Sequence, residues 1–292
     1  MEKKDIAYII LHYNSIEDTL KCVSSLQLIT GGKIVIVCNG STNGSDRKIY
    51  ETYNEVPGVY VIVNETNLGF ARGLNVGYRF AKYELNSKMI LCLNNDIIVT
   101  QNEFEDILIE EYFQNKFALA GPDVRNPEGE CCNPWHMKIP TINDVEEVLK
   151  YYKKLYRNSC VLWGLPDLMN SIRNKLFSNK INFEQQMLEL KDNPDYIMTF
   201  HGSFLIFSEI FISKRDGLFD KTFLYGEEHI LGYECYRDDL KVYYCSKLKA
   251  LHNESASTKK SLTTPIKRHR FFYKHLVDSY EEYLNLLKSD NR

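Results

Sequence analysis

The sequence has few of the features that mark membrane, zinc-binding or nucleic-acid-binding proteins. No stretch reaches the roughly 18 apolar residues of a membrane span, and the run from Ile6 to Leu11 is too short for a signal sequence. The eight cysteines form no C-x-x-C pair, which argues against a cysteine-rich zinc site. The net charge is only −3, from 36 cations and 39 acids, so the excess of cations typical of nucleic-acid binders is absent. We therefore expect no nucleic-acid partner, and a cytoplasmic protein with reduced thiols.

The first 121 residues alternate between strand-like and helix-like segments. With 292 residues, 44% of them hydrophobic, the chain is long enough for a large core. Apolar runs predict strands, and apolar residues at helical spacing predict helices between them. We predict strands at 6–11, 33–38, 59–63, 89–93 and 117–120, and helices at 15–28, from 45, 70–83 and 101–114. This alternation indicates right-handed crossovers and a parallel sheet.

Polar clusters follow the C-terminal ends of the first four strands. They are His12 to Asn14, Asn39 to Asp46, Asn64 to Asn67, and Asn94 to Asp96. In open α/β sheets, ligands bind in the crevice beyond these ends. We therefore expect the four clusters to meet at one site.

The second half of the chain is less regular. Residues 122–195 break the alternation and are interpreted as an irregular loop with helices, a candidate substrate lid. A strand is predicted at 196–207, a helix at 231–238, a strand at 241–245 and a long helix at 265–288.

Asp96 is a candidate metal ligand. An acid at the end of a buried strand is costly unless it is paired or bound to a metal, and Mg²⁺ or Mn²⁺ takes its remaining ligands from water and phosphates. The alternative is a helix cap or turn residue before the helix near Gln101.

Two other segments suit a nucleotide but also have plainer interpretations. The loop from Asn39 to Ser45 either brings backbone amides to a nucleotide or is an ordinary turn with Ser45 as the N-cap. Arg72 lies near a predicted helix start, where a cation is unfavourable. It either faces an anion such as a diphosphate or is a solvated surface residue.

Glu227 and Glu228 stand at another predicted helix start. They either stabilise the helix dipole or supply a general base for a hydroxyl. His252 follows a strand-like stretch and is either a ligand of a metal or phosphate or a surface histidine.

Five of these segments, taken in order, resemble glycosyltransferase family 2 and, within it, the bacterial rhamnosyltransferase-like branch. They are IILHYNS, IVCNGSTNGS, NLGFARGLNVG, LCLNND and FDKTFLYGEEHILGYECYRDDLKVYYCSKLKALH. The resemblance covers residues 6 to about 121 and 200 to 255. It implies the GT-A fold, a Rossmann-like, mainly parallel sheet flanked by helices, with an acceptor-side insertion and a C-terminal helical extension.

The resemblance also implies roles for particular residues. Asp96 would be the metal-binding acid of a DxD-like motif, with His252 beside the metal, which would be Mn²⁺ or Mg²⁺. Glu228 stands where the family has its catalytic Asp, with Glu227 in front of it. The residues implied to line the nucleotide pocket are Tyr13, Cys38, Asn39, Asn67, Arg72, Asn94 and Asn95.

Three positions depart from the family pattern. Cys38 replaces an Asp that often contacts the nucleotide base, and a thiol is a poor acceptor. Glu228 replaces Asp and adds a methylene, and Ile230 replaces a second acid that commonly follows.

The resemblance places the acceptor near residues 122–202. Trp135 and His136 are candidates for stacking on a sugar, with core or lid packing as the alternative for Trp135. His201 and Gly202 match the region near the acceptor, where a glycine leaves room for substrate.

The C-terminal helix carries several cations and an apolar stripe at helical spacing. The stripe comprises Phe272, Leu276, Tyr280, Tyr283 and Leu287, and the cations include Lys259, Lys260, Lys267 and Arg268. The helix either lies on an anionic membrane as a peripheral contact or packs on the protein with a solvated basic face.

The sequence thus predicts a GT-A domain at 1–256 and a basic helical extension at 257–292. Within the domain, 1–121 would bind the nucleotide sugar, 122–200 would form the acceptor-side insertion or lid, and 201–256 would carry the base. The predicted activity is metal-dependent, inverting sugar transfer from a UDP- or dTDP-linked donor, with dTDP-rhamnose a candidate, to a lipid- or protein-linked glycan acceptor. A sugar nucleotidyltransferase would need a glycine-rich loop after the first strand, where this chain has HYNSIED. A non-catalytic sugar-nucleotide-binding protein on the same fold is the alternative that the three departures favour.

Overall fold

The computed structural model describes residues 1–159, 195–253 and 265–290. Cys160, Lys259, Lys260, the proposed boundary at 256 and residues 160–194 of the predicted insertion lie outside these ranges. The described strands are β1 (Ile6–His12), β2 (Lys33–Asn39), β3 (Val59–Asn64), β4 (Met89–Asn94), β5 (Ile97–Ile98), β6 (Leu119–Arg125), β7 (Trp135–Lys138), β8 (Tyr196–Thr199), β9 (Phe204–Ser208) and β10 (Val242–His252). The helices are the short 3₁₀ helix η1 (Lys3–Asp5), α1 (Ile16–Gln27), α2 (Ser45–Tyr53), α3 (Phe70–Tyr83), α4 (Phe104–Asn115), α5 (Ile142–Ser159), α8 (Glu209–Lys214), α9 (Glu227–Arg237) and α11 (Pro265–Asp290).

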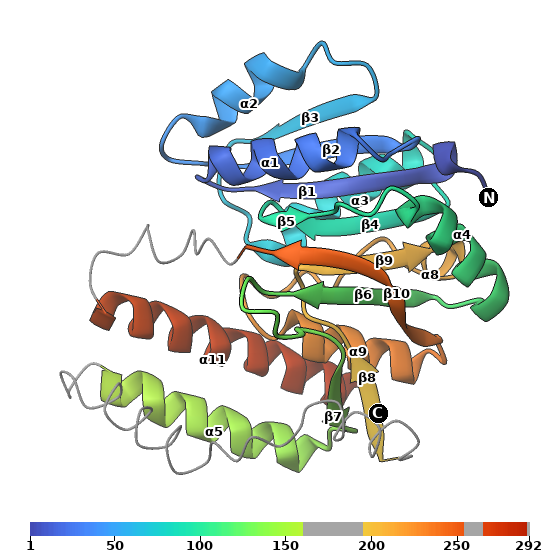
Figure 1. The fold of residues 1–292 in the computed structure, drawn as a ribbon. Helices are drawn as coiled ribbons and strands as arrows, with labels where there is room; N and C mark the ends of the chain where they lie inside the picture. The colour runs from blue at the N-terminus through green and yellow to red at the C-terminus, as the bar shows by residue number, and fades with distance from the viewer. Residues whose placement is uncertain (160–194, 254–264, 291–292) are drawn as a thin grey trace.

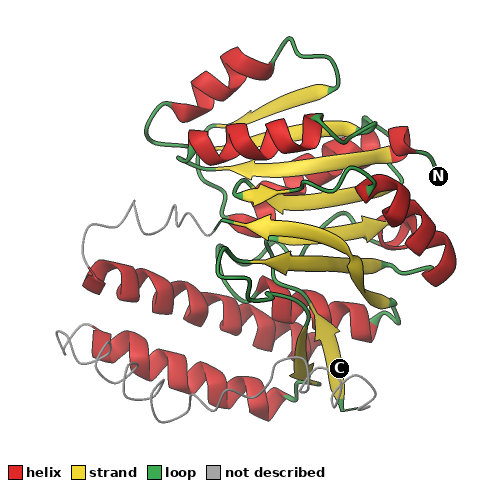
Figure 2. Ribbon diagram, in the orientation of Figure 1, coloured by secondary structure: helices red, strands yellow, loops and turns green. Residues whose placement is uncertain are grey.

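Within the described residues, the main sheet has the strand order β3-β2-β1-β4-β9-β6-β10-β5 (Figure 1). The first four strands pair in parallel, as the alternating pattern predicts. Strand β9 lies antiparallel between β4 and β6, while β6 and β10 are parallel to each other. The mainly parallel sheet flanked by helices is therefore confirmed. Figure 2 shows helices on both of its faces.

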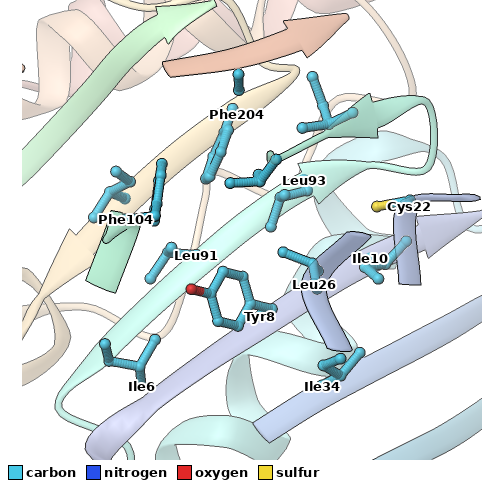
Figure 3. Close-up of a cluster of buried hydrophobic side chains, with 14 of the residues drawn as sticks. Ile6, Tyr8, Ile10, Cys22, Leu26, Ile34, Leu91, Leu93, Phe104 and Phe204 are labelled. Carbon is cyan, nitrogen blue, oxygen red and sulfur yellow. The ribbon is translucent and has the colours of Figure 1, made fainter. Parts of the chain in front are cut away.

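Alternation along the strands divides the core into two layers. One layer packs Tyr8 and Ile10 of β1 against α1, α2 and α4, and Figure 3 shows these side chains meeting Leu91, Leu93 and Phe104. The other layer packs the intervening residues of β1, such as Ile9, against α3, α8 and α9. Successive residues of a strand point to opposite faces of the sheet. The side chains of β2 therefore also alternate between these two core layers.

Two strand predictions differ from the structure. The segment predicted as one strand at 196–207 forms β8 and β9, which belong to different sheets, because the chain turns at residues 200–203. The strand predicted to end at Ala120 continues to Arg125, because β10 pairs with it along that length. The sheet thus extends into the region predicted as irregular.

Helix α11 packs on the protein through its apolar stripe. Leu276, Tyr280, Tyr283 and Leu287 are buried against residues of α5 and α9, while Phe272 is 37% exposed. Lys153 and Lys288 bind Glu281 and Glu146 between α5 and α11, which run antiparallel, side by side (Figure 1). The stripe therefore fits the packing interpretation rather than insertion into a membrane. No helix in the described part of the chain is both long and apolar enough to cross a membrane.

Candidate active site

A cavity of about 950 Å³ lies at the C-terminal ends of the parallel strands. It is lined from all four polar clusters that the sequence predicts to meet. The predicted residues that line it are Tyr13, Asn39, Asn67, Asn94, Asn95 and Asp96. The convergence inferred from strand order is therefore confirmed, although the roles of these residues stay predictions.

Asn39 uses its side chain to organise one wall of this cavity. Its Nδ2 donates to the Asn67 side chain (3.2 Å) and to the Gly69 carbonyl (3.0 Å). Its Oδ1 accepts from Asn64 Nδ2 and from the Leu68 amide, both at 3.2 Å. Two donors and two lone pairs are all that an amide side chain has. Asn39 therefore shapes the loop before α3, and its side chain has no remaining capacity for a nucleotide.

The loop after β2 is tied to the loop after β1. Asn14, with a φ of 61°, accepts from the Thr42 amide through Oδ1 and from Asn43 Nδ2 through its carbonyl. Gly44, with a φ of 75°, is the N-cap of α2, so the alternative assignment of Ser45 as N-cap is wrong. Ser45 is the first helical residue, and its Oγ lies 2.9 Å from Nε2 of the buried His12. These contacts hold one rim of the cavity in place.

Cys38 and Arg72 do not lie with the other predicted nucleotide residues. Cys38 points to the opposite face of β2 from Asn39, is 0% exposed and packs in the core, where burial raises its pKa to about 12. Arg72 is exposed on α3 and is absent from the cavity lining. Since a helix turns about 100° per residue, a side chain two positions after the cavity-lining Phe70 points away from the cavity.

Asp96 faces His252 at the edge of the cavity. Asp96 Oδ1 is buried, has no hydrogen-bond partner and lies 3.2 Å from His252 Nε2. The antiparallel pairing of β10 with β5 brings them together, because it sets His252 opposite Ile97. The N-cap of α4 is Glu103, so Asp96 does not cap that helix.

This pair fits a divalent cation. A carboxylate oxygen without a hydrogen-bond partner beside an imidazole nitrogen is a donor set that Mg²⁺ and Mn²⁺ accept. The described residues contain no group of three or more acidic, histidine or cysteine side chains that could hold a metal alone. The other ligands would therefore be substrate phosphates and water.

Asn94 and Asn95 fix the chain leading into Asp96. The Asn94 amide donates to the Ser203 carbonyl at 2.9 Å. Asn95 Nδ2 donates to the Ser15 carbonyl at 3.1 Å and to Thr19 Oγ1 at 2.9 Å. The turn that carries Asp96 is thus attached to α1 on one side and to the start of β9 on the other.

Glu227 and Glu228 begin α9 but lie in different environments. Glu227 is 5% exposed, its Oε1 has no hydrogen-bond partner, and burial together with the nearby Glu228 charge raises its pKa to about 8. Glu228 is only partly buried, and its Oε1 accepts from the Gly202 amide at 3.2 Å. Near pH 7 Glu227 is mostly protonated, which leaves Glu228 as the acid with a position suited to a base.

Gly202 connects Glu228 to the cavity. A Cβ at this glycine would lie 3.0 Å from Glu228 Oε1 and 3.2 Å from the ring of Phe70. Phe70 itself lines the cavity. The carboxylate therefore approaches the cavity wall at a point where only a glycine fits without displacing a neighbour.

A group of aromatic rings lies near Gly202 and Glu228. The ring centroids of Trp135 and His201 are 5.4 Å apart, and those of His201 and His252 are 5.5 Å apart. His229, a residue that the sequence did not single out, lies 6.3 Å from Trp135. The structure thus groups Trp135, His201 and Gly202 beside Glu228 and His252. His136 points to the opposite face of β7 from Trp135, and burial lowers its pKa.

Sequence reasoning missed the apolar part of the cavity wall. Phe70, Phe223, Leu224 and Phe271 line it, and Phe271 comes from α11. One signal for this wall was present in the sequence. It is Gly69, which has a φ of 87° in the structure. A Cβ there would lie 2.3 Å from the Phe223 carbonyl oxygen, which also accepts from the Phe70 amide at 2.8 Å. The glycine therefore marks a close approach between two distant segments.

Comparison with known proteins identifies the family. Residues 8–210 match the sequence model described as "Glycosyl transferase family 2". The chain belongs to glycosyl transferase family 2. The family resemblance predicted from the five motifs is therefore confirmed.

The chain is also similar in sequence to a curated protein and in fold to solved structures. The chain is 23% identical over 281 residues to the low-salt glycan biosynthesis hexosyltransferase Agl10 of Haloferax volcanii, covering 96% of this chain and 73% of Agl10. Two solved structures share its fold: S. aureus TarS 1-349 in complex with UDP-GlcNAc and GalNAc-T7 with UDP, GalNAc and Mn²⁺. For TarS the TM-score is 0.52 with 14% identity, covering 93% of this chain and 65% of TarS 1-349. For GalNAc-T7 it is 0.56 with 13% identity, covering 96% and 49%. The chain thus spans less than two thirds of either structure.

Proposed function

We propose that this protein is a metal-dependent, inverting glycosyltransferase that moves a sugar from a nucleoside-diphosphate donor to a glycan hydroxyl. The observation that carries the proposal is the pair Asp96 and His252 at the edge of a cavity whose lining residue Phe70 lies beside Gly202 and Glu228. Asp96 and His252 are suited to hold a cation beside a diphosphate. Glu228 is suited to act as a general base. Family membership and the similarity to a hexosyltransferase support the same reaction class.

Glu228 would act as the general base. Its carboxylate takes the proton of the acceptor hydroxyl while that oxygen bonds to the anomeric carbon of the sugar. The bond from this carbon to the diphosphate oxygen breaks, and the nucleoside diphosphate leaves with the electron pair. A single displacement of this kind inverts the anomeric configuration. A divalent cation, when bound, neutralises the charge that develops on the leaving diphosphate.

The protein's own groups would position the substrates for this step. Asp96 and His252 would hold a divalent cation, which would supply positive charge for the diphosphate. The Gly202 amide holds the Glu228 carboxylate by its 3.2 Å hydrogen bond. Trp135 and His201 lie next to this point and would contact the acceptor, because an aromatic face matches the apolar C–H face of a sugar.

The donor would be a UDP- or dTDP-linked sugar. Two solved structures with this fold contain UDP or UDP-GlcNAc, and the rhamnosyltransferase-like motifs favour dTDP-rhamnose. Cys38 points into the core, and the side chain of Asn39 already makes all the hydrogen bonds that it can. Neither side chain would therefore contact the base of the nucleotide. Base recognition would therefore fall to Tyr13 and the loops around Asn14 and Asn43. We place the acceptor among cell-surface polysaccharide or glycoprotein glycans.

Incubation of the purified protein with UDP-GlcNAc, UDP-glucose, dTDP-glucose and dTDP-rhamnose, with and without Mn²⁺, tests the proposal. Release of the nucleoside diphosphate that depends on Mn²⁺ and is lost in Glu228→Gln supports transferase chemistry. The burial of Cys38 away from the cavity favours a second candidate, a non-catalytic nucleotide-sugar-binding protein. Binding of a donor without any release of diphosphate, even with mixed glycan acceptors, would favour that candidate.

A further inference from the structure

Helix α11 contributes to the cavity although it lies outside the residues that match the family. Its residue Phe271 lines the cavity beside Phe223 and Leu224. In Figure 1 the arrowheads of β1, β6 and β10 point to one side of the sheet, and α11 begins on that side. The C-terminal helix therefore does more than pack against α5 and α9.

A set of contacts from α11 holds the segment that precedes Glu227. The ring of His275 stacks on Phe223, with centroids 4.7 Å apart and planes 27° apart, and it also contacts the ring of Phe271, with centroids 4.3 Å apart. Ser279 Oγ donates to the Leu224 carbonyl at 3.1 Å. Phe271 is thus held in place by the same histidine that supports Phe223.

Part of the apolar wall lies close to Glu228, the proposed base. The Phe223 carbonyl accepts a hydrogen bond from the Phe70 amide. The ring of Phe70 lies beside Gly202 and hence beside Glu228. The cavity is also lined by polar residues of the loops after β1 and β2, among them Tyr13, Asn14 and Asn43. In a transfer reaction the diphosphate lies at Asp96, and the sugar lies between the diphosphate and the base. The apolar wall, one residue of which lies close to Glu228, would therefore contact the transferred sugar.

We infer that α11 completes the subsite for the transferred sugar, and that Phe271 contacts this sugar through an apolar C–H face or methyl group. The inference rests on the proposed function, because it requires a nucleotide-sugar donor in this cavity. It assigns the nucleotide and the sugar to different elements. The strand ends and their loops hold the nucleotide, and α3, the 222–226 segment and α11 enclose the sugar.

The test compares the binding of a nucleotide sugar with that of its nucleoside diphosphate. Isothermal titration calorimetry with Mn²⁺ measures Kd for UDP against UDP-GlcNAc and UDP-glucose, and for dTDP against dTDP-rhamnose and dTDP-glucose. Phe271→Ala is expected to raise Kd for the bound nucleotide sugar about tenfold, which corresponds to about 1.4 kcal/mol. Kd for the matching diphosphate is expected to change by less than about twofold.

Two further variants make the result specific. Phe271→Leu keeps an apolar side chain and is expected to give a smaller loss than Phe271→Ala. Phe113→Ala removes a ring that is 50% exposed on α4 and absent from the cavity lining, and it is expected to change neither Kd. Thermal melting of each variant confirms that the protein is folded.

Equal weakening of sugar nucleotide and diphosphate by Phe271→Ala would overturn the inference, since the ring would then contact the nucleotide. An unchanged Kd for both would overturn it as well. If the wild-type protein bound none of these ligands, the proposed function would fail first and the sugar subsite with it. The wild-type titrations therefore distinguish the two failures.

Discussion

Asp96 Oδ1 and His252 Nε2 lie 3.2 Å apart, although 156 residues separate them in the chain. The short strand β5 follows Asp96 directly and pairs with the last residues of β10. The carboxylate oxygen has no hydrogen-bond partner, and neither has His252 Nδ1. Such a buried acceptor is costly unless a ligand satisfies it. The geometry thus explains why a two-residue strand matters for the chemistry.

Asp96→Asn is expected to abolish metal-dependent nucleotide binding with little change in shape. An amide lacks the charge that a divalent cation requires, and loss of several kcal/mol of charge stabilisation lowers the transfer rate by about 10²-fold or more. Thermal shift with UDP or dTDP, with and without Mn²⁺, measures the binding. Asp239→Asn, an exposed residue with a φ of 50°, is the control and should keep the shift. A full metal-dependent shift in Asp96→Asn would contradict the assignment.

Glu228→Gln is expected to lower kcat by about 10²- to 10⁴-fold while donor Kd stays within about twofold, because the amide cannot take the acceptor proton. Glu227→Gln should lower kcat far less, since the buried Glu227 is mostly protonated near neutral pH. Steady-state transfer kinetics and donor titrations measure both quantities. A larger kcat loss in Glu227→Gln than in Glu228→Gln would reverse the assignment of the base.

The contribution of Glu227 to the stability of the wild-type protein is expected to fall between about pH 5 and pH 8. Its pKa is about 8 in the folded protein, against an ordinary value of 4.5, chiefly because it is buried. Across this window the unfolded chain loses the proton and the folded protein keeps it, so rising pH favours unfolding. Melting temperatures of wild type and Glu227→Gln across this range check the sign. The advantage of the variant should grow as pH rises, and a constant difference would show that Glu227 does not titrate as proposed.

Gly69→Ala is expected to destabilise the fold by about 1–3 kcal/mol and to weaken donor binding. The added Cβ would lie 2.3 Å from the Phe223 carbonyl oxygen and would push apart two segments of the cavity wall. Gly58→Ala is the matched control, because its φ is 80° but nothing lies within 4 Å of the new Cβ. Urea unfolding of both variants separates the contact from the backbone strain. Equal losses would mean that the close approach to Phe223 contributes nothing.

Local sequence pattern was sufficient to predict most helices and strands in the first half of the chain. The helix predicted at 70–83 is α3, and the strands predicted at 33–38 and 89–93 are β2 and β4 to within one residue. Their strong periodicity and flanking turn residues explain this accuracy. Prediction from local pattern failed at 196–207, where apolar residues continue through a turn that divides the segment between two sheets. Hydrophobicity alone does not reveal which neighbour a strand will pair with.

The sequence by itself determined the family, the parallel half of the sheet and the meeting of four polar clusters, because these follow from local periodicity, chain order and motifs. Only the tertiary structure decided which side chains of those clusters reach the cavity. The alternation of β2 turned Cys38 into the core, and a network of hydrogen bonds occupied the side chain of Asn39. The tertiary structure also decided that Glu227 is buried while Glu228 is accessible, and that Phe271 of α11 lines the cavity. Burial and contacts between distant segments depend on how the elements pack, which no local pattern specifies.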